Sequence, residues 1–244
     1  MIGEPFIILS TIDSTNNYAK TLAREGLAKD GMVVFAHEQT HGRGQKTNQW
    51  LSERGSNIMM SAIIDASWLS IHHQFQLSCA TVVACSDFFS QYAGDETCIK
   101  WPNDLYWRDR KAGGVLIENI VKGNIWENAI IGIGLNINQT AYDKMKNKPV
   151  SLKQITGKSF EVEQLAKELC GCLNKRFNEL KSGHFEDHLK IYNERLYKKG
   201  QEVTLKKGDD LISTTIESIN NIGELVTQKD SKIIFSYGEV EWLL

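Results

Sequence analysis

A lysine stands inside a short stretch that otherwise has the character of a half-buried strand, Ile99 to Asp104, with the sequence IKWPND. Pro102 biases Trp101 before it toward extended backbone. If Lys100 lies at the buried end of a strand, its ammonium needs an anionic partner such as a carboxylate or a phosphate. The simpler interpretation is a turn whose lysine points to solvent, because most lysines stay solvated.

A second candidate anion site is the polar segment Gln39 to Trp50, QTHGRGQKTNQW, which follows an apolar strand. Gly42 and Gly44 let the backbone approach a ligand closely, and Arg43 between them offers a guanidinium. Further donors in the segment are Gln45, Lys46 and Asn48. A polar connection of this length is often a lid, although a mobile surface loop would look similar. Trp50 either stacks on a flat group or fills the core.

Two further motifs place polar or small residues at the ends of apolar strands. Residues 13–16, DSTN, open a helical stripe, and such a corner either offers free N–H groups and hydroxyls to a small polar ligand or simply caps the helix. Gly132 and Gly134 interrupt an apolar strand that ends in Asn136 and Asn138. Glycines inside a strand indicate either a bulge or a ligand that lies flat on the sheet.

The periodicity of apolar residues predicts a sheet with helices packed against it. The expected strands are Phe6–Ile12, Gly31–Glu38, Asn57–Asp65, Leu105–Trp107, Ala112–Glu118 and Asn124–Asn138. The expected helices are a stripe from Tyr18 to Leu27, then His72–Tyr92, Val162–Leu180 and His184–Leu196. A turn at residues 108–110 would make Leu105–Trp107 and Ala112–Glu118 a hairpin and return Lys111, close to Gly113 and Gly114, toward Lys100.

The pattern of apolar and polar residues changes from Lys198 onward. Gly200 to Leu244 is a series of short alternating segments separated by glycine and Asn-Asn turns, which predicts a small antiparallel barrel. We place a domain boundary near Tyr197, so that residues 1–197 form the larger domain and residues 198–244 the smaller one.

The composition indicates an ordinary globular protein, with 244 residues, 41% hydrophobic and 24% charged. A formal net charge of -2 and the lack of a basic run argue against a nucleic-acid partner. The sequence has no run long enough to cross a bilayer, and its first residues do not resemble a signal peptide. Five cysteines without paired spacing predict reduced thiols and a cytoplasmic protein.

Two possible metal motifs are better explained without a metal. Cys170 and Cys172 have no second cysteine pair, and their apolar helical surroundings favour core packing. His184 and His188 share a helix face at a spacing that suits zinc. In HFEDH, however, the residue directly after the first histidine is Phe185 and not the glutamate that the metalloprotease pattern has there. We therefore predict a solvated helix face for the two histidines.

The ordered set of motifs resembles that of biotin protein ligases, enzymes that join biotin to a lysine of biotin-dependent carboxylases. K-W-P-N-D followed by K-x-G-G is its most specific part, and by motif the resemblance covers Ile7 to Asn138. It extends by pattern to the terminal barrel. It implies an α+β fold: a mixed β-sheet flanked by helices, like the catalytic domains of class II aminoacyl-tRNA synthetases and biotin synthetases, with a small C-terminal SH3-like β-barrel.

The resemblance implies a reaction in two steps. The carboxylate of biotin attacks the α-phosphate of ATP to give biotinyl-5'-AMP and pyrophosphate, and a lysine of a biotin carboxyl carrier protein domain then attacks the acyl carbon. Fixed cations stabilise the charge that gathers on the phosphate oxygens, and Mg²⁺ would accompany ATP, with protein ligands that stay unknown. Because water hydrolyses an acyl-adenylate, a lid is needed, and the Gly42–Trp50 loop is the candidate.

The resemblance also assigns roles to individual residues. The catalytic residues would be Arg43, Lys100 and Lys111, with Asp104 a candidate base for the attacking lysine. The biotin-binding residues would be Ser14, Thr15, Asn16, Gln39, Gly42, Arg43, Gly44, Lys100, Gly114, Gly132 and Gly134. The residues that bind ATP or the adenylate would be Arg43, Gln45, Lys46, Trp50, Asn103, Lys111 and Asn136.

One position departs from the family pattern, and it lies in the loop. Relatives often carry arginine where Gln45 stands, so we expect Lys46 to substitute in part and adenylate retention to differ. The chain starts at the catalytic strand, which predicts a ligase without the amino-terminal winged helix that makes some relatives repressors. A lipoate or octanoate ligase of the same fold and a non-catalytic biotin-binding sensor are the alternatives. The oligomeric state stays open between monomer and homodimer.

Overall fold

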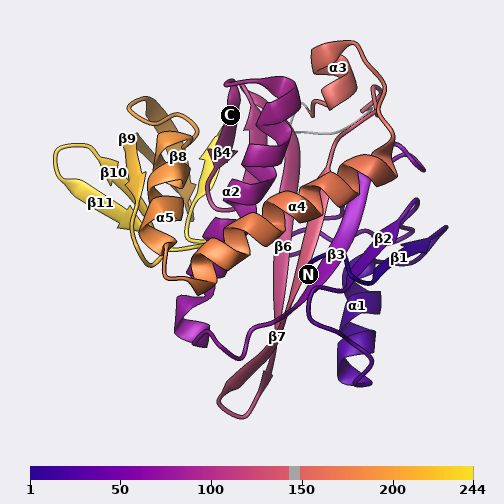
Figure 1. Cartoon of the computed structure of the whole chain (residues 1–244). Helices are drawn as coiled ribbons and strands as arrows, with labels where there is room; N and C mark the ends of the chain where they lie inside the picture. Colours follow the sequence, from indigo (N-terminus) through magenta and orange to yellow (C-terminus); the bar gives the residue numbers. More distant parts are fainter. Residues whose placement is uncertain (143–148, 244) are drawn as a thin grey trace.

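The computed structural model describes residues 1–142 and 149–243, and these form two β-sheets with helices around the larger sheet (Figure 1). The larger sheet has the strand order β1-β2-β3-β7-β6-β5-β4, and the smaller one has the order β11-β10-β9-β8-β12. The strands are β1 (Phe6–Leu9), β2 (Val33–Ala36), β3 (Ile58–Asp65), β4 (Thr97–Lys100), β5 (Asp104–Trp107), β6 (Arg110–Lys122), β7 (Ile125–Leu135), β8 (Glu202–Lys207), β9 (Asp210–Ile219), β10 (Leu225–Gln228), β11 (Lys232–Phe235) and β12 (Glu241–Leu243). The helices are α1 (Thr15–Arg24), the 3₁₀ turn η1 (Ile71–His73), α2 (Gln74–Ala93), α3 (Leu152–Thr156), α4 (Val162–Lys181) and α5 (Phe185–Glu194).

The larger sheet is mixed, as predicted. β1 and β2 pair in parallel, whereas the other pairings in this sheet are antiparallel. β3 lies inside the sheet, and its residues from Ile58 to Ile64 are all buried. Such a strand is a continuous apolar run because helices cover both of its faces.

The helices divide the sheet into two packed faces. Apolar residues of α2 and α4, such as Phe88 and Leu173, belong to the main core of the protein, and Figure 1 shows both helices lying across one face of the sheet. On the opposite face Ala19 of α1 packs against Val34 and Ile130. The predicted sheet flanked by helices is therefore confirmed.

The first strand is shorter than predicted, and this matters for the site. β1 ends at Leu9 instead of Ile12, and Ile12 then pairs with Gln39 in an isolated parallel bridge. The amide of Thr40 donates to the carbonyl of Ile12 at 2.9 Å. The start of the polar segment therefore runs beside the N-terminus of α1, which begins at Thr15.

The two histidines near the start of α5, His184 just before the helix and His188 within it, correct a prediction. His184 is largely exposed, but His188 is fully buried, and its Nε2 lies 3.0 Å from Oε2 of Glu179. Glu179 also pairs with Arg176, whose guanidinium is bound to Asp87 at 2.6 Å. The face predicted to be solvated is thus partly packed against α4. In the ranges that the structure describes, no group of three or more residues suited to a metal ion occurs.

The second sheet is antiparallel throughout, as its alternating segments predict. The indole Nε1 of Trp101, just after β4, donates to the carbonyl of Gly223 at 2.9 Å. The ring of Tyr197 lies 5.0 Å from Tyr106 and 5.8 Å from Trp242. The residue at the predicted boundary therefore contacts both sheets, and the boundary stays a prediction. Leu244, the last residue of the predicted barrel, lies outside the described residues.

The cysteines all lie within the described ranges, and all five are free. Cys170 belongs to the main core and Cys172 packs against it, which confirms the predicted core packing. Among the helices described, none is both long and apolar enough to cross a membrane.

Candidate functional site

A cavity of ≈ 410 Å³ opens beside the larger sheet, and the polar segment and the second sheet both contribute to its walls. This volume suits a small-molecule ligand. The predicted site residues that line the cavity are Ser14, Thr15, Asn16, Gln39, Arg43, Gly44, Gln45, Lys46, Trp50, Lys100, Asn103, Asp104, Lys111, Gly114, Gly132 and Gly134. Gly42 and Asn136 do not line it.

One end of the cavity is a buried polar corner. Ser14 precedes α1 without making a side-chain capping bond, so capping does not explain this serine. Gln39 Oε1 accepts hydrogen bonds from the amide and the hydroxyl of Thr15, at 2.7 and 3.0 Å. Ser61 Oγ lies 2.7 Å from Thr15 Oγ1 and 2.6 Å from Asn16 Oδ1. Because these groups already hold one another, they present a fixed set of donors and acceptors to the cavity.

The glycines of β7 form the floor of the cavity, and the bulge interpretation is wrong. Gly132 and Gly134 stay in continuous register with both neighbouring strands. A Cβ at Gly134 would lie 2.6 Å from the ring of Trp50, and one at Gly132 would lie 2.9 Å from Cγ of Asn16. The glycines thus allow these two side chains to lie against the sheet. Trp50 also lines the cavity, and its buried indole Nε1 has no hydrogen-bond partner among the described residues.

Lys100 does not point freely into solvent, so the simpler interpretation is wrong. Its ammonium is half-buried and lies 5.3 Å from the centre of the Tyr106 ring and 5.4 Å from that of Trp242. Burial lowers the pKa of Lys100 from the usual lysine value; Asp104 opposes this shift and the charge of Lys111 adds to it. Within the described residues Lys100 forms no ion pair, so an incoming anion would stabilise its charge.

The β5–β6 hairpin returns Lys111 to this end of the sheet, as predicted. Asp104 pairs with Lys100 across β4 and β5, and Asp104 also pairs with Gly114 across β5 and β6. The ammonium of Lys111 lies 2.7 Å from Oδ1 of Asp104. Asp104, the predicted base, is therefore the ion-pair partner of Lys111.

Three predicted site residues support the backbone around the cavity: Asn103, Asn136 and Gly42. The Nδ2 group of Asn103 donates to the carbonyl of Val115, and Nδ2 of Asn136 donates to that of Lys111 at 3.2 Å. A Cβ at Gly42 would collide with the carbonyl of Trp50. These contacts hold the walls together. The nucleotide contacts of Asn103 and Asn136 and the biotin contact of Gly42 stay predictions.

The Gly42–Trp50 loop is closed on itself by backbone hydrogen bonds. The amide of Gly44 donates to the carbonyl of Asn48, and the amide of Trp50 donates to that of Gly42, both at 2.9 Å. Lys46 reaches the turn between β11 and β12 of the second sheet, where its ammonium lies 3.5 Å from the carbonyl of Gly238. The loop therefore spans the space between the two sheets.

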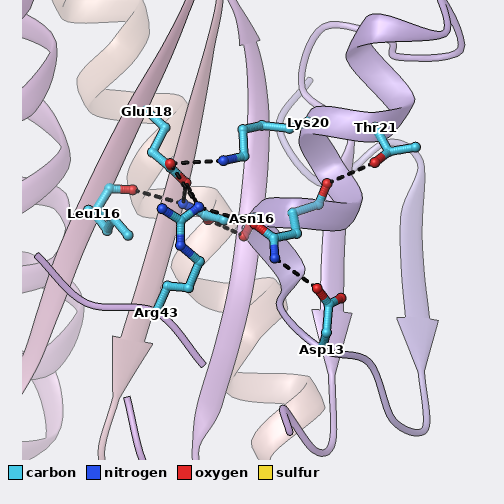
Figure 2. Close-up of polar contacts among 9 residues, drawn as sticks. Asp13, Asn16, Lys20, Thr21, Arg43, Leu116 and Glu118 are labelled. Atoms are coloured by element: carbon cyan, nitrogen blue, oxygen red, sulfur yellow. Dashed lines mark hydrogen bonds and ion pairs between the residues drawn. The ribbon is translucent and has the colours of Figure 1, made fainter. Parts of the chain in front are cut away.

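The guanidinium of Arg43 is bound within the protein, although Arg43 lines the same cavity as Lys100 and Lys111. Figure 2 shows it beside Glu118 of β6, with Nη1 at 2.9 and 3.0 Å from the two carboxylate oxygens. Nη1 also lies 3.1 Å from Oδ1 of Asn17. A half-buried carboxylate thus binds the cation that the motif assigned to a ligand.

Glu118 binds two more donors besides Arg43. Oε1 accepts from the ammonium of Lys20 at 2.9 Å, and Oε2 accepts from Nδ2 of Asn16 at 2.9 Å. Burial alone would raise the pKa of Glu118, but the hydrogen bonds from Lys20 and Asn16 and the charges of Lys20 and Arg43 outweigh it and lower the pKa. The carboxylate is therefore held in its charged form.

The model of the biotin/lipoate A/B protein ligase family matches residues 8–136, which include the polar corner, the loop, the glycine floor and both lysines. This chain belongs to that family. The bifunctional ligase/repressor BirA of Bacillus spizizenii is 32% identical over 182 residues, which cover 73% of this chain and 55% of the relative. A biotin–acetyl-CoA-carboxylase ligase of Paracoccus denitrificans is 26% identical over 225 residues, or 90% of this chain and 92% of the relative.

Solved structures of family members share the fold. The biotin protein ligase of Aquifex aeolicus in complex with biotin and ATP matches with a TM-score of 0.82 at 24% identity, covering 98% of each chain. The chain spans between 40% and 55% of the length of the first four BirA relatives that it matches. The likeness in structure extends over both sheets, whereas the family model ends at Asn136.

Several residues that contribute to the site of this chain were not predicted from the sequence. Ser61 and Glu118 lie inside the stretch that the family model matches. Ser61 is the polar residue within the buried run Ile58–Ile64, and that contrast is a signal that could have found it. The connection between β11 and β12 adds Tyr237, Gly238 and Val240 to the cavity lining, and β12 adds Glu241 and Trp242. No sequence motif indicates these five residues, because only the docking of the two sheets brings them to the site.

Proposed function

We propose that this chain is a cytoplasmic, ATP-dependent ligase that activates biotin as biotinyl-5'-AMP and transfers it to a lysine of a biotin carboxyl carrier protein domain. The buried polar corner carries the proposal. Its hydroxyls and amides complement the two N–H groups and the carbonyl of the biotin ureido ring. The lipoyl dithiolane ring has no such groups and would form no hydrogen bonds with the corner, which disfavours its binding relative to biotin.

The remaining walls suit the rest of the ligand. The rings of biotin would lie near Gly132 and Gly134, between Asn16 and Trp50, with the carboxylate directed toward Lys100. Lys100 forms no ion pair within the described residues, and a carboxylate and an α-phosphate would supply its counter-charge. The name of the Paracoccus denitrificans relative, which covers 90% of this chain, supports biotin as the substrate.

Mg²⁺ would neutralise phosphate oxygens and orient ATP for the displacement. Among the described residues of the lining, the carboxylates are those of Asp104 and Glu241, and Asp104 is already paired with Lys111. This donor set suits an ion carried mainly by the phosphates of ATP rather than by a protein cage.

The loop would protect the adenylate from water. It reaches Glu118 through Arg43 and the second sheet through Lys46, and Gln45 offers an amide where many relatives offer a charge. We therefore expect this enzyme to retain the adenylate less tightly than relatives with arginine at that position.

Incubation of the protein with labelled biotin, ATP, Mg²⁺ and a carrier domain tests the proposal. We expect label on the carrier and biotin-dependent pyrophosphate release, and neither with lipoate. Transfer of lipoate instead of biotin would contradict biotin as the substrate and favour the lipoate ligase. Biotin binding without pyrophosphate release would favour the non-catalytic sensor. Lys100→Ala should abolish transfer, and full transfer by that variant would contradict the catalytic role of Lys100.

A further inference from the structure

Glu118 joins three separate parts of the protein through one carboxylate. It lies on β6 and binds Lys20 and Asn16 of α1 together with Arg43 of the loop, each at 2.9 Å (Figure 2). The side chain of Glu118 is 20% exposed, compared with 39% for that of Arg43. Charge-assisted hydrogen bonds in such a half-buried place are stronger than those on the open surface.

The charges around Glu118 are not balanced. One carboxylate faces two cations, and the side chain of Lys20, at 19% exposed, is as sheltered as the carboxylate itself. If Arg43 leaves, Glu118 keeps Lys20 and Asn16, so no buried charge is left unpaired. Arg43 can therefore be released without the large penalty that normally follows when one partner of a buried ion pair is removed.

Three contacts attach the Gly42–Trp50 loop to the rest of the protein. Its backbone hydrogen bonds tie Gly44 to Asn48 and Trp50 to Gly42. Trp50 packs on Gly134, Lys46 reaches the β11–β12 turn, and Arg43 binds Glu118. Of these three contacts, the one between Arg43 and Glu118 joins two charged groups.

We propose that Glu118 is a positioning residue that holds the Gly42–Trp50 loop closed through Arg43, with Lys20 as the cation that keeps Glu118 paired when the loop opens. Arg43 then acts mainly as the fastener of the lid rather than as a direct ligand of the phosphate. Where it concerns the adenylate, this inference rests on the proposed function; the loop contact itself does not.

Two substitutions should move the loop in opposite directions. Glu118→Gln removes the charge that Arg43 binds, so the loop should open more often. Lys20→Met leaves Arg43 as the sole cation on Glu118, so the loop should open less often. A general loss of packing would change both variants in the same direction, which makes the pair diagnostic.

Hydrogen exchange of the ligand-free full chain measures the opening. The reporter amides are those of Gly44, Asn48 and Trp50, which donate within the loop at 2.9 to 3.0 Å. A loop that leaves the sheet loses the packing that protects these short hydrogen bonds, so their amides exchange faster. We expect their exchange in Glu118→Gln to be about tenfold faster than in the wild type, and in Lys20→Met several-fold slower, as loss or gain of one charge-assisted bond predicts. Glu96→Gln, which removes a carboxylate from an exposed ion pair with Arg108, is the matched control and should leave these rates unchanged.

Wild-type exchange in Glu118→Gln would overturn the proposal, and so would faster exchange in Lys20→Met. If Glu118→Gln does not fold, Arg43→Gln tests the same contact from the exposed side and should also show the faster rates. With biotin, ATP and carrier present, Glu118→Gln should release more adenylate per carrier modified. Failure of biotin activation alongside the expected exchange rates would overturn the proposed function and leave the loop contact standing.

Discussion

Replacement of Lys100 by methionine should make the protein more stable while it removes the proposed activity. Methionine keeps an unbranched stem of similar length without the charge. Burial lowers the pKa of Lys100, which means that folding disfavours its charged form. A lysine whose pKa is lower in the folded than in the unfolded state destabilises the protein at neutral pH, and this penalty is relieved as pH rises above the folded pKa.

The size of the gain in stability depends on the contacts that remain when the ammonium of Lys100 is removed. The rings of Tyr106 and Trp242 lie at 5.3 and 5.4 Å and are apolar surfaces that a thioether can also contact. Asp104 keeps its 2.7 Å ion pair with Lys111, so the substitution leaves no carboxylate without a partner. We expect the free energy of unfolding to rise by about 0.5–2 kcal/mol, as for other stabilising substitutions at functional sites. For a protein of this size that is about 2–4 °C in Tm per kcal/mol.

Thermal unfolding of the wild type and Lys100→Met at pH 7 and near pH 10 checks both the sign and the cause. The advantage of the variant should shrink at the higher pH, because the wild-type lysine then loses its proton in the folded state. Lys111→Met is the matched control: it leaves Asp104 without its ion-pair partner and should lower the Tm. A Tm of Lys100→Met below that of the wild type, or a gain independent of pH, would refute the reasoning.

Three further outcomes are expected. Gly132→Ala should lower biotin affinity at least about tenfold in calorimetric titration, because the new Cβ would lie 2.9 Å from Cγ of Asn16 and displace that side chain. Gln45→Arg should slow escape of the adenylate, measured as AMP released into solution, and an unchanged rate would contradict the role given to the loop. Because the pKa of Glu118 is lowered from 4.5, its ion pairs should stabilise the protein above that pH and be lost as pH falls through the lower folded value. Amide protection in the loop should therefore persist at pH 4.5 and decline only in more acidic solution.

Much of the site could be predicted because its residues are of types that are unusual at their positions in strands and strand ends. A lysine in a strand, two glycines in another strand and a polar corner after a third are each unusual alone, and the fold brings all of them to one cavity. The hairpin that returns Lys111 beside Asp104 follows directly from strand periodicity and a short turn. These features depend on local geometry, which the sequence encodes within a few residues.

The unpredicted parts depend on contacts between distant segments. Glu118 lies 75 positions from Arg43, and no spacing rule connects the two. Helical periodicity places His184 and His188 on one face, but only the packing of α5 on α4 decides that His188 is buried. Trp242 reaches Lys100 because the second sheet docks beside β4, which the alternating pattern of that sheet does not indicate.

Two cations, one buried and one half-buried, show how a residue of the site differs from a residue of the scaffold. Arg176 is 8% exposed and binds both Asp87 and Glu179; burial opposes its charge, but these carboxylates outweigh it and raise its pKa. Lys100 has two aromatic rings and, in the described part of the chain, no ion pair, and its pKa is lowered. Arg176 is therefore satisfied by the fold alone, whereas the proposed anionic ligand would supply the counter-charge that Lys100 lacks among the described residues. Since stability does not explain Lys100, its place in the strand is best explained by what it binds.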